Sequence, residues 1–296
     1  MLKKMIISLL TATFLSSTFL VNPAHAKASE ITISKSQMDK AIENLKDFGF
    51  DDESIERLPS SEVAKYSEID WVGSKTKYFK FEEIKDGLLR NSTVKPEVLV
   101  KEITEEEFNN ADISTFAGNE NIAQNSYMKF EARAGQKGSD KHKFLIAGRA
   151  TWKGSPTQRG NDIIGIGTSA NLIPQQNTFY SEMTYKKSGV YTNGGSKSTP
   201  TTMDSNGAGV TWDIPNDSGH IIYQDVSIYL SFDANASIST SNLQNFGIDG
   251  QYKQQTSSLV VNPSFSFSTG GSISISASYQ TKYKDLLSVY TSFNNK

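Results

Sequence analysis

The feature that most constrains the fold is a strict alternation of apolar and small polar residues near the end of the chain. Residues 257–280 read SSLVVNPSFSFSTGGSISISASYQ, and serine fills most of the even positions. Because successive side chains of a strand point to opposite faces, this pattern predicts a β-hairpin with one apolar face and one hydroxyl face. The apolar face consists of Leu259, Val261, Phe265, Phe267, Ile273, Ile275, Ala277 and Tyr279.

The register of this hairpin follows from keeping its apolar residues on one face. A two-residue loop would place Phe267 opposite a serine and divide the apolar set between the two faces. A three-residue loop pairs Phe267 with Ile273 and Phe265 with Ile275. We therefore predict a three-residue turn with a glycine in the left-handed conformation. Pro263 cannot donate to a strand ladder, so it marks an edge position or a bulge.

The same alternation recurs from residue 116 onward and predicts about eight strands. A run that is apolar on both faces, as in a central strand, begins at residue 162, and the Gly-, Ser- and Thr-rich residues 187–209 predict a long loop. Turn signals separate the strands and no helical pattern lies between them, which favours an antiparallel sandwich or barrel. The other alternating stretches are 128–134, 144–152, 179–185, 210–214, 226–238 and 246–252.

Helical signals open the chain after residue 30. Ser36 can cap an amphipathic helix, and Gly49 fits the left-handed residue that follows such a helix. Asp51 or Asp52 can cap a second short helix, which Pro59 ends before a third begins. After these helices, residues 69–84 indicate a pair of strands turning at Gly73, and residues 94–113 indicate a strand followed by a short acidic helix.

Charge divides the chain at the same place as the secondary-structure signals. Residues 27–115 hold 13 Lys/Arg against 20 Asp/Glu, a net of −7, whereas residues 116–296 hold 15 against 12, a net of +3. We therefore expect an acidic α+β N-terminal region at 27–115, either a propeptide or a small domain, before an antiparallel β-domain at 116–296. The fold class is mainly β.

The first 26 residues have the composition of a secretory signal peptide. Lys3 and Lys4 precede an apolar stretch, Pro23 interrupts it, and Ala24-His25-Ala26 supplies the small residues that a signal peptidase reads. The chain has no cysteine, so its own core must hold it together without disulfides. We expect a secreted, extracellular protein, and the lysine-rich signal without cysteine is typical of exports from Gram-positive bacteria.

Catalytic patterns are sparse, which leans against an enzyme. The chain lacks HExxH, GxSxG and a phosphate-binding glycine loop, and it has no cysteine nucleophile. His142 lies in a polar turn, and His220 has no spacing that defines a triad. Scattered carboxylates such as Asp213 and Asp225 leave a hydrolase open as a third hypothesis.

Three aromatic residues are candidates for ligand binding. Trp152 and Trp212 could stack on sugars or meet a membrane, although both follow the apolar parity of their strands and therefore suit a core better. Tyr191 lies in the predicted long loop and is the most exposed candidate.

Oxygen-bearing side chains cluster between residues 204 and 217. Asp204, Asn206, Asp213 and Asp217 could bind Ca²⁺, although the EF-hand spacing is absent. No other cofactor is indicated. The β-half has a net charge of only +3 and no aromatic residues among basic clusters. We therefore expect no nucleic-acid partner.

A local pattern resembles a family of proteins. Trp152, Pro156 and Asp162, followed by Ile164 and Ile166, read W-x3-P-x5-D-x-I-x-I, and the helical opening reads ENLKDFGFDDESIERLP. Both are similar to uncharacterised secreted β-rich proteins of Gram-positive bacteria. The resemblance covers about a third of the chain and implies location and fold only, because these proteins have no activity to carry over.

The first hypothesis for function is therefore a secreted, non-catalytic protein that binds a cell-envelope or glycan ligand or associates with itself. The second is a β-pore-forming toxin or antimicrobial protein, activated by release of the N-terminal region. In that case Phe265, Phe267, Ile273 and Ile275 would form a membrane or self-association hairpin, because membrane strands need about 9–11 residues of such alternation. The oligomeric state stays open.

Overall fold

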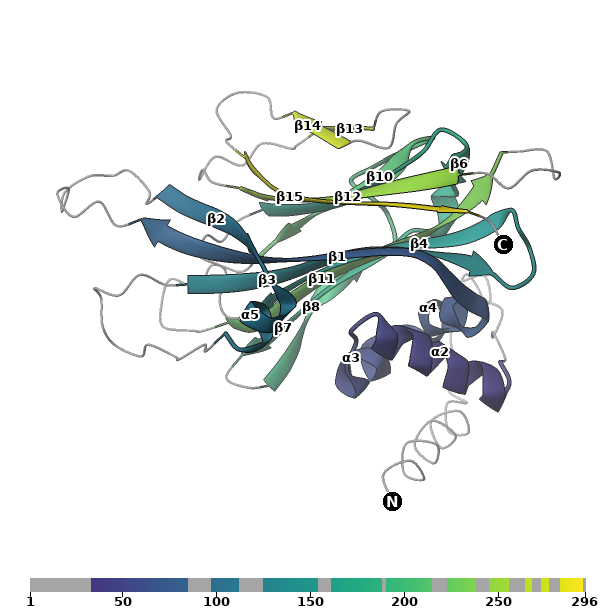
Figure 1. Ribbon diagram of the computed structural model, residues 1–296. Helices are drawn as coiled ribbons and strands as arrows, with labels where there is room; N and C mark the ends of the chain where they lie inside the picture. The colour runs from purple at the N-terminus through teal and green to yellow at the C-terminus, as the bar shows by residue number, and fades with distance from the viewer. Residues whose placement is uncertain are drawn as a thin grey trace, which may run out of the picture. The chain divides into compact units, whose positions relative to one another are not determined.

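The computed structural model places two antiparallel sheets face to face, with helices outside one sheet and a hairpin outside the other (Figure 1). This arrangement confirms the predicted fold class: mainly β, with a sandwich preceded by a helical region. The structure describes residues 33–84, 97–111, 125–153, 161–187, 190–214, 223–237, 245–255, 264–267, 273–276 and 283–294.

The helical layer comprises α2 (Lys35–Asp47), α3 (Asp52–Arg57), α4 (Ser60–Lys65) and the 3-10 turn η1 (Tyr66–Glu68). The cap of α2 is Ser34, not the predicted Ser36, because Ser34 and Gln37 form a reciprocal capping box. Of the two predicted caps of the second helix, Asp51 is the one that caps α3, and the predicted left-handed Gly49 has a φ of +83° after α2.

The larger sheet has eight strands in the order β2-β1-β3-β4-β11-β7-β8, with β6 pairing to β11. The longer strands pair with their neighbours over most of their length, and all of these pairs are antiparallel. The strands are β1 (Ile69–Ile84), β2 (Glu97–Ile103), β3 (Asn125–Lys137), β4 (Lys143–Lys153), β6 (Leu172–Pro174), β7 (Tyr180–Lys187), β8 (Val190–Lys197) and β11 (Tyr223–Ala236). As predicted, a short acidic helix, α5 (Glu105–Asn109), follows β2.

The predicted strand pair at residues 69–84 is wrong, because β1 is one strand with a bulge between Trp71 and Gly73. A bulge inserts one residue and reverses which face each parity occupies. Ile69 therefore packs against the helices, whereas Phe79, also at an odd position, packs into the core between the sheets. Gly73 marked the bulge, not a turn.

The smaller sheet has five strands in the order β15-β12-β5-β10-β9. They are β5 (Asn161–Thr168), β9 (Thr202–Asp204), β10 (Gly207–Asp213), β12 (Asn245–Gln255) and β15 (Tyr283–Asn294). β5 lies at the centre, as its two apolar faces predicted. The predicted loop at 187–209 is wrong, because β8 and β9 form there as edge strands whose small polar residues need little burial in the core.

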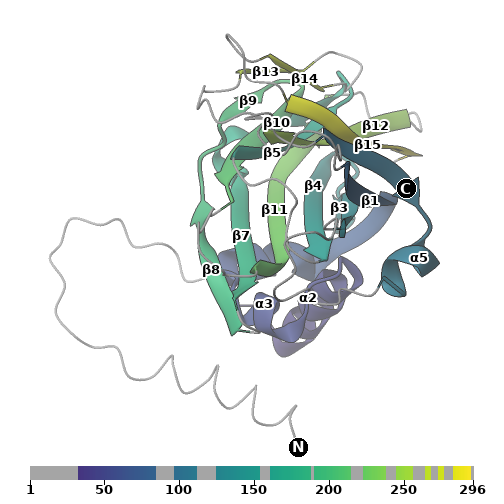
Figure 2. The same cartoon turned by 90° about the vertical axis from the view of Figure 1, so that its left-hand side faces the viewer.

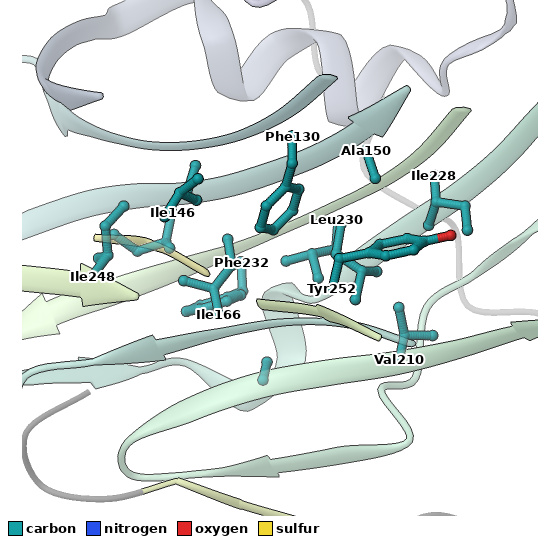
Figure 3. Close-up of a cluster of buried hydrophobic side chains, with 14 of the residues drawn as sticks. Phe130, Ile146, Ala150, Ile166, Val210, Ile228, Leu230, Phe232, Ile248 and Tyr252 are labelled. Carbon is teal, nitrogen blue, oxygen red and sulfur yellow. The ribbon is translucent and has the colours of Figure 1, made fainter. Parts of the chain in front are cut away.

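The main core fills the space between the two sheets (Figure 3). Phe130, Ile146 and Phe232 of the larger sheet face Ile166 and Ile248 of the smaller one, and all are buried. A second apolar cluster lies on the other face of the larger sheet, where Leu145 and Tyr229 meet the helices. β4 is therefore buried on both faces, although only its inner alternation was predicted.

The helices and both sheets belong to one compact unit, residues 33–296. β1 precedes the predicted boundary at residue 115 and β3 follows it, yet the two pair along one sheet. The boundary itself and the signal sequence lie outside the described residues, so cleavage at either place stays a prediction. Within the described part of the chain, no helix is long and apolar enough to cross a membrane.

Candidate functional site: the β13–β14 hairpin

The predicted hairpin forms, and its register is confirmed. β13 (Ser264–Phe267) pairs with β14 (Ile273–Ser276), with Phe265 opposite Ile275 and Phe267 opposite Ile273. Residues of like parity therefore share a face, as the apolar alternation required. The turn residues 268–272 and Pro263 lie outside the described residues.

The hairpin is a separate two-stranded sheet that pairs with neither large sheet. It lies over the face of the five-stranded sheet that points away from the core, with β13 against β9 and β14 against β5 and β12 (Figures 1 and 2). Phe267 is the one hairpin side chain whose surroundings the structure describes, and it is only 7% exposed.

Phe267 rests on Gly207 of β10. A Cβ atom built on Gly207 would lie 2.4 Å from Cδ1 of Phe267 and 2.5 Å from the carbonyl oxygen of Ile166. Any side chain at residue 207 would therefore collide both with the phenyl ring and with the neighbouring strand. The glycine gives the ring a seat directly on the backbone of the sheet.

This seat belongs to a floor of four glycines, which we call the glycine floor: Gly165, Gly167, Gly207 and Gly209. On β10 these positions alternate with the core residues Ala208 and Val210, so they face outward. In the pairing of β5 with β10, Gly207 lies opposite Gly167 and Gly209 opposite Gly165. All four are buried. Two glycine pairs side by side remove the side chains that would otherwise hold a covering segment away from the sheet.

Asn206 connects the floor to the hairpin backbone. Its side-chain Nδ2 donates to the carbonyl oxygen of Phe267 over 3.5 Å, and its own carbonyl accepts from the amide of Thr168 over 2.7 Å. The turn that holds Asn206 is fixed by Asp204, whose carboxylate accepts from the Asn206 amide over 2.7 Å. Asn206, predicted as a calcium ligand, is thus placed at the hairpin contact.

Of the predicted calcium ligands, the structure places Asp204 beside Asn206 but Asp213 far from both. Asp204 lies opposite Gly207 at one end of β10, and Asp213 ends the strand six residues later, about 20 Å away. Asp217 lies outside the described residues. Among the residues that are described, no group of three or more acidic, His or Cys side chains could hold a metal ion.

Tyr191 occupies a different place from the exposed loop that the sequence predicted. It lies on β8 and is half-buried, and its hydroxyl donates to the carboxylate of Asp51, the cap of α3. Lys186 Nζ lies 4.4 Å and the Arg57 guanidinium 5.9 Å from the ring centroid. Burial, followed by the bond to Asp51, raises the pKa of Tyr191. The residue links sheet to helix, and cations flank its ring.

Trp152 and Trp212 are buried, as their parity predicted. The Trp152 ring packs 4.5 Å from that of Phe81, and its Nε1 donates to the hydroxyl of Tyr252 over 3.0 Å. Tyr252 in turn donates to Asp162. Trp152 and Asp162 of the W-x3-P-x5-D pattern therefore converge on one hydroxyl inside the core, which gives the pattern a structural explanation. Burial raises the pKa of Asp162 well above its ordinary value.

A buried polar network holds the helices to the larger sheet, and we call it the helix clamp: Glu62, Lys65, Tyr66, Tyr229 and Ser231. Glu62, 2% exposed, accepts from Tyr229 over 2.6 Å and from Ser231, and it pairs with Lys65 over 2.5 Å. The Tyr66 hydroxyl lies 2.5 Å from that of Tyr229. No sequence signal indicated this network, because its members are 163 or more residues apart across the sheet contact.

Two arginines extend the helix clamp. Arg133 lies 5.2 Å from the ring centroids of Phe48 and Trp71 and pairs with Asp47. Arg149 lies 4.0 Å over the ring of Phe50, and burial lowers its pKa. Charged groups and aromatic faces therefore alternate across this contact, which stabilises desolvated guanidinium groups.

Comparison with protein-family models and with curated proteins finds no match. Among solved structures, the collagen adhesin CNA from S. aureus has a TM-score of 0.27 at 10% identity, covering 75% of this chain and 81% of that chain. The collagen-binding domain of the Erysipelothrix rhusiopathiae surface protein RspB has a TM-score of 0.22 at 7% identity, covering 58% and 66%. At these TM-scores the resemblance is weak, and no conclusion about this chain rests on it.

Proposed function

We propose that the protein acts outside the cell without catalysis, by binding a surface, and that this surface is a lipid bilayer met by β13–β14. The observation that carries the proposal is the hairpin itself: an alternating serine and apolar strand pair that lies on the glycine floor and forms a two-stranded sheet of its own, outside both large sheets. Location outside the cell rests on the signal-like first 26 residues.

Such a hairpin can occupy either of two solvents. In water its apolar face must be covered, because exposed Phe and Ile side chains cost free energy. In a bilayer the same face meets hydrocarbon, while the serine face can meet water or other protein. Because β13 and β14 pair with each other, the hairpin can leave the glycine floor without losing the hydrogen bonds between its two strands.

A cell-envelope or glycan ligand has less support from the positions of the candidate residues. Trp152 and Trp212 have almost no exposed surface, and the ring of Tyr191 is flanked by Lys186 and Arg57. Self-association, activation by cleavage near residue 115 and a hydrolase with scattered carboxylates remain predictions from sequence.

Vesicle association tests the proposal. Vesicles of phosphatidylcholine with one-third phosphatidylglycerol, loaded with dye, are mixed with the purified protein and with two variants, Phe265→Asp and Ser266→Asp. These neighbouring positions lie on opposite faces of β13. We expect binding and dye release to fall roughly tenfold for Phe265→Asp and to change little for Ser266→Asp, because only the first places a charge against lipid.

Circular dichroism and urea unfolding serve as controls, and both variants should keep the fold. Wild-type protein that leaves vesicles unbound and intact would refute the proposal, and so would equal effects of the two substitutions. Retention of wild type on a cell-wall or glycan fraction in that case would favour the envelope hypothesis instead.

A further inference from the structure

We infer that the outer face of β12 and β15 holds a sugar-binding site, in which Tyr290 stacks on a pyranose ring and Asp249 hydrogen-bonds with the hydroxyl groups of that ring. The inference goes beyond the proposed function, because the site uses neither the hairpin nor the hydrocarbon of a bilayer.

Tyr290 supplies an aromatic platform. It is the most exposed aromatic side chain that the structure describes, with 57% of its surface exposed. Its neighbour Val289 is buried in the core, so Tyr290 and Ser292 belong to the outer face of β15. Single exposed aromatic residues are common on protein surfaces, so the case depends on how this ring is held and on what lies beside it.

The ring is held against the sheet by way of a glycine. Gly247 is the diagonal neighbour of Tyr290 on β12, and a Cβ atom built there would lie 2.8 Å from the Tyr290 hydroxyl oxygen and 3.1 Å from Cε2. The ring therefore leans along the sheet, which leaves its other face towards solvent. The Gly247 backbone is itself fixed, because its amide donates to Ser169 Oγ over 3.1 Å and its carbonyl accepts from the Ser169 amide over 2.9 Å.

Asp249 supplies the polar contact beside this platform. It lies directly opposite Tyr290 in the pairing of β12 with β15. Asp249 is only 9% exposed, and its Oδ2 accepts from Gln251 Nε2 over 3.1 Å, whereas its Oδ1 has no hydrogen-bond partner among the described residues. Burial raises the pKa of Asp249 despite the bond from Gln251. Leaving a buried acceptor unsatisfied is costly, so a ligand that donates to this oxygen gains the free energy of that bond.

The two groups together specify the chemical class of the ligand. A gluco-configured pyranose has a face of axial C–H groups that fits an aromatic ring, and its rim carries hydroxyl groups that hydrogen-bond with a carboxyl group. Opposite residues of an antiparallel pair have Cβ atoms about 5 Å apart, so a sugar on Tyr290 brings its rim to Asp249. A purely apolar ligand would leave Asp249 unpaired, and an anion would be repelled by its carboxylate.

Covering Gly247 is the alternative role for Tyr290, because aromatic side chains stabilise sheets by packing over glycines on a neighbouring strand. That role accounts for the face of the ring that lies against the sheet. It gives no partner to Oδ1 of Asp249 and predicts no ligand, so a binding measurement separates the two roles.

Ligand-observed saturation-transfer NMR tests the inference in the full-length protein, with soluble cellotriose as the probe. We expect the affinity for cellotriose to fall roughly tenfold for Tyr290→Ser, which removes the platform, and for Asp249→Asn, which removes the charge-assisted bond. Tyr290→Phe keeps the ring and should change the affinity less than about threefold. The matched control is Val190→Ser on β8, a position 67% exposed on the other sheet, which should leave the affinity unchanged.

Two further arms distinguish the source of the sugar. Vesicles of phosphatidylcholine with and without monoglucosyldiacylglycerol are mixed with the wild-type protein, in the presence and absence of cellotriose. If cellotriose competes with vesicles that carry the glucolipid, the site takes the headgroup of a lipid. If cellotriose binds and the glucolipid does not improve vesicle binding, the site takes a soluble or polymeric glycan.

The result that would overturn the inference is equally direct. Wild-type protein that shows no saturation transfer to cellotriose, or a Tyr290→Ser variant that binds it as well as wild type, would leave Tyr290 with the role of covering Gly247 alone. Circular dichroism identifies a variant that has lost its fold, and if Asp249→Asn does so, the comparison of Tyr290→Ser with Tyr290→Phe decides. The vesicle test of Phe265→Asp contains no sugar, so the proposed function stands or fails separately.

Discussion

The two sheets of this protein are covered on their outer faces in different ways. The helices cover the larger sheet with Leu45, Phe48 and Tyr66, all completely buried, and with the helix clamp. The hairpin covers part of the smaller sheet: Phe267 lies directly on Gly207, and the side chain of Asn206 donates to the carbonyl oxygen of Phe267. The helices are held by side chains from both partners, whereas at Phe267 the hairpin meets glycine backbone on the sheet.

The difference indicates how each cover responds to a change of environment. Separating the helices would leave Glu62 and Arg149 without the partners that compensate their burial, and leaving such groups unpaired is costly. The described residues of the hairpin include no charged side chain. If the hairpin leaves the glycine floor, none of them is left with an unpaired charge. We therefore expect the helices to unfold together with the sheet and the hairpin to move independently of it.

The largest expected effect is on the helical cover. Phe48→Ala removes a completely buried ring that lies 5.6 Å from that of Trp71 and 6.1 Å from that of Tyr229. The free energy of unfolding should fall by about 3–5 kcal/mol in urea titrations. Leu99→Ala at a position 51% exposed should change it by less than about 0.5 kcal/mol. A small effect of Phe48→Ala would show that the helices are loosely attached.

The helix clamp should show the next largest effect. Glu62→Gln removes the charge that Lys65 pairs with over 2.5 Å in a buried setting, and we expect a loss of about 2–3 kcal/mol. Glu53→Gln, in the more exposed pair with Arg57, is the matched control and should cost about 0.5 kcal/mol or less. If the two variants lost the same free energy of unfolding, the burial of Glu62 in the helix clamp would not be what makes its ion pair stabilising.

The pH dependence of stability should come in part from the core between the sheets. The pKa of Asp162 is raised by burial from 3.8, so the folded protein keeps a proton that the unfolded chain loses. This contribution is fully present at low pH and is lost as pH rises from the unfolded value towards the folded pKa. Asp162→Asn should make the decline in urea midpoint above about pH 4 shallower. An unchanged slope would show that Asp162 does not titrate in this way.

The smallest change in global stability is expected at the hairpin. Phe267→Ala should lower the free energy of unfolding by about 1 kcal/mol or less, because the hairpin can detach while the sheet stays folded. Amide hydrogen exchange in residues 264–276 should nevertheless quicken at least roughly tenfold, with β5 and β10 unchanged. If exchange in β5 and β10 rises equally, the hairpin and the sheet form one cooperative unit and the comparison fails.

Local signals predicted those elements whose patterns are complete within a few residues. The register of β13 with β14, the cap at Asp51 and the left-handed Gly49 follow from alternation and capping rules that depend on near neighbours. β8 was missed because its residues are small and polar, so it forms a strand only by pairing with β7. β1 was divided because a glycine at a bulge and a glycine in a turn look the same in sequence.

The candidate site was predicted in part. The apolar face of the hairpin could be read from sequence, but the glycine floor could not, since two GxG runs on different strands become one surface only when Gly207 lies opposite Gly167. Asn206 was singled out for its oxygen, and the structure uses its side-chain amide as a donor to Phe267. The helix clamp left no local signal at all.

The sequence by itself determined that the chain forms antiparallel strands with apolar and polar faces, that the hairpin keeps Phe265 and Phe267 on one side, and that helices come first. Only the tertiary structure decided what each face meets. Alternation specifies that a face avoids water, whereas the identity of its neighbour depends on segments tens or hundreds of residues away. For the Phe267 side of the hairpin that neighbour is a buried glycine, Gly207, on a strand far away in the sequence.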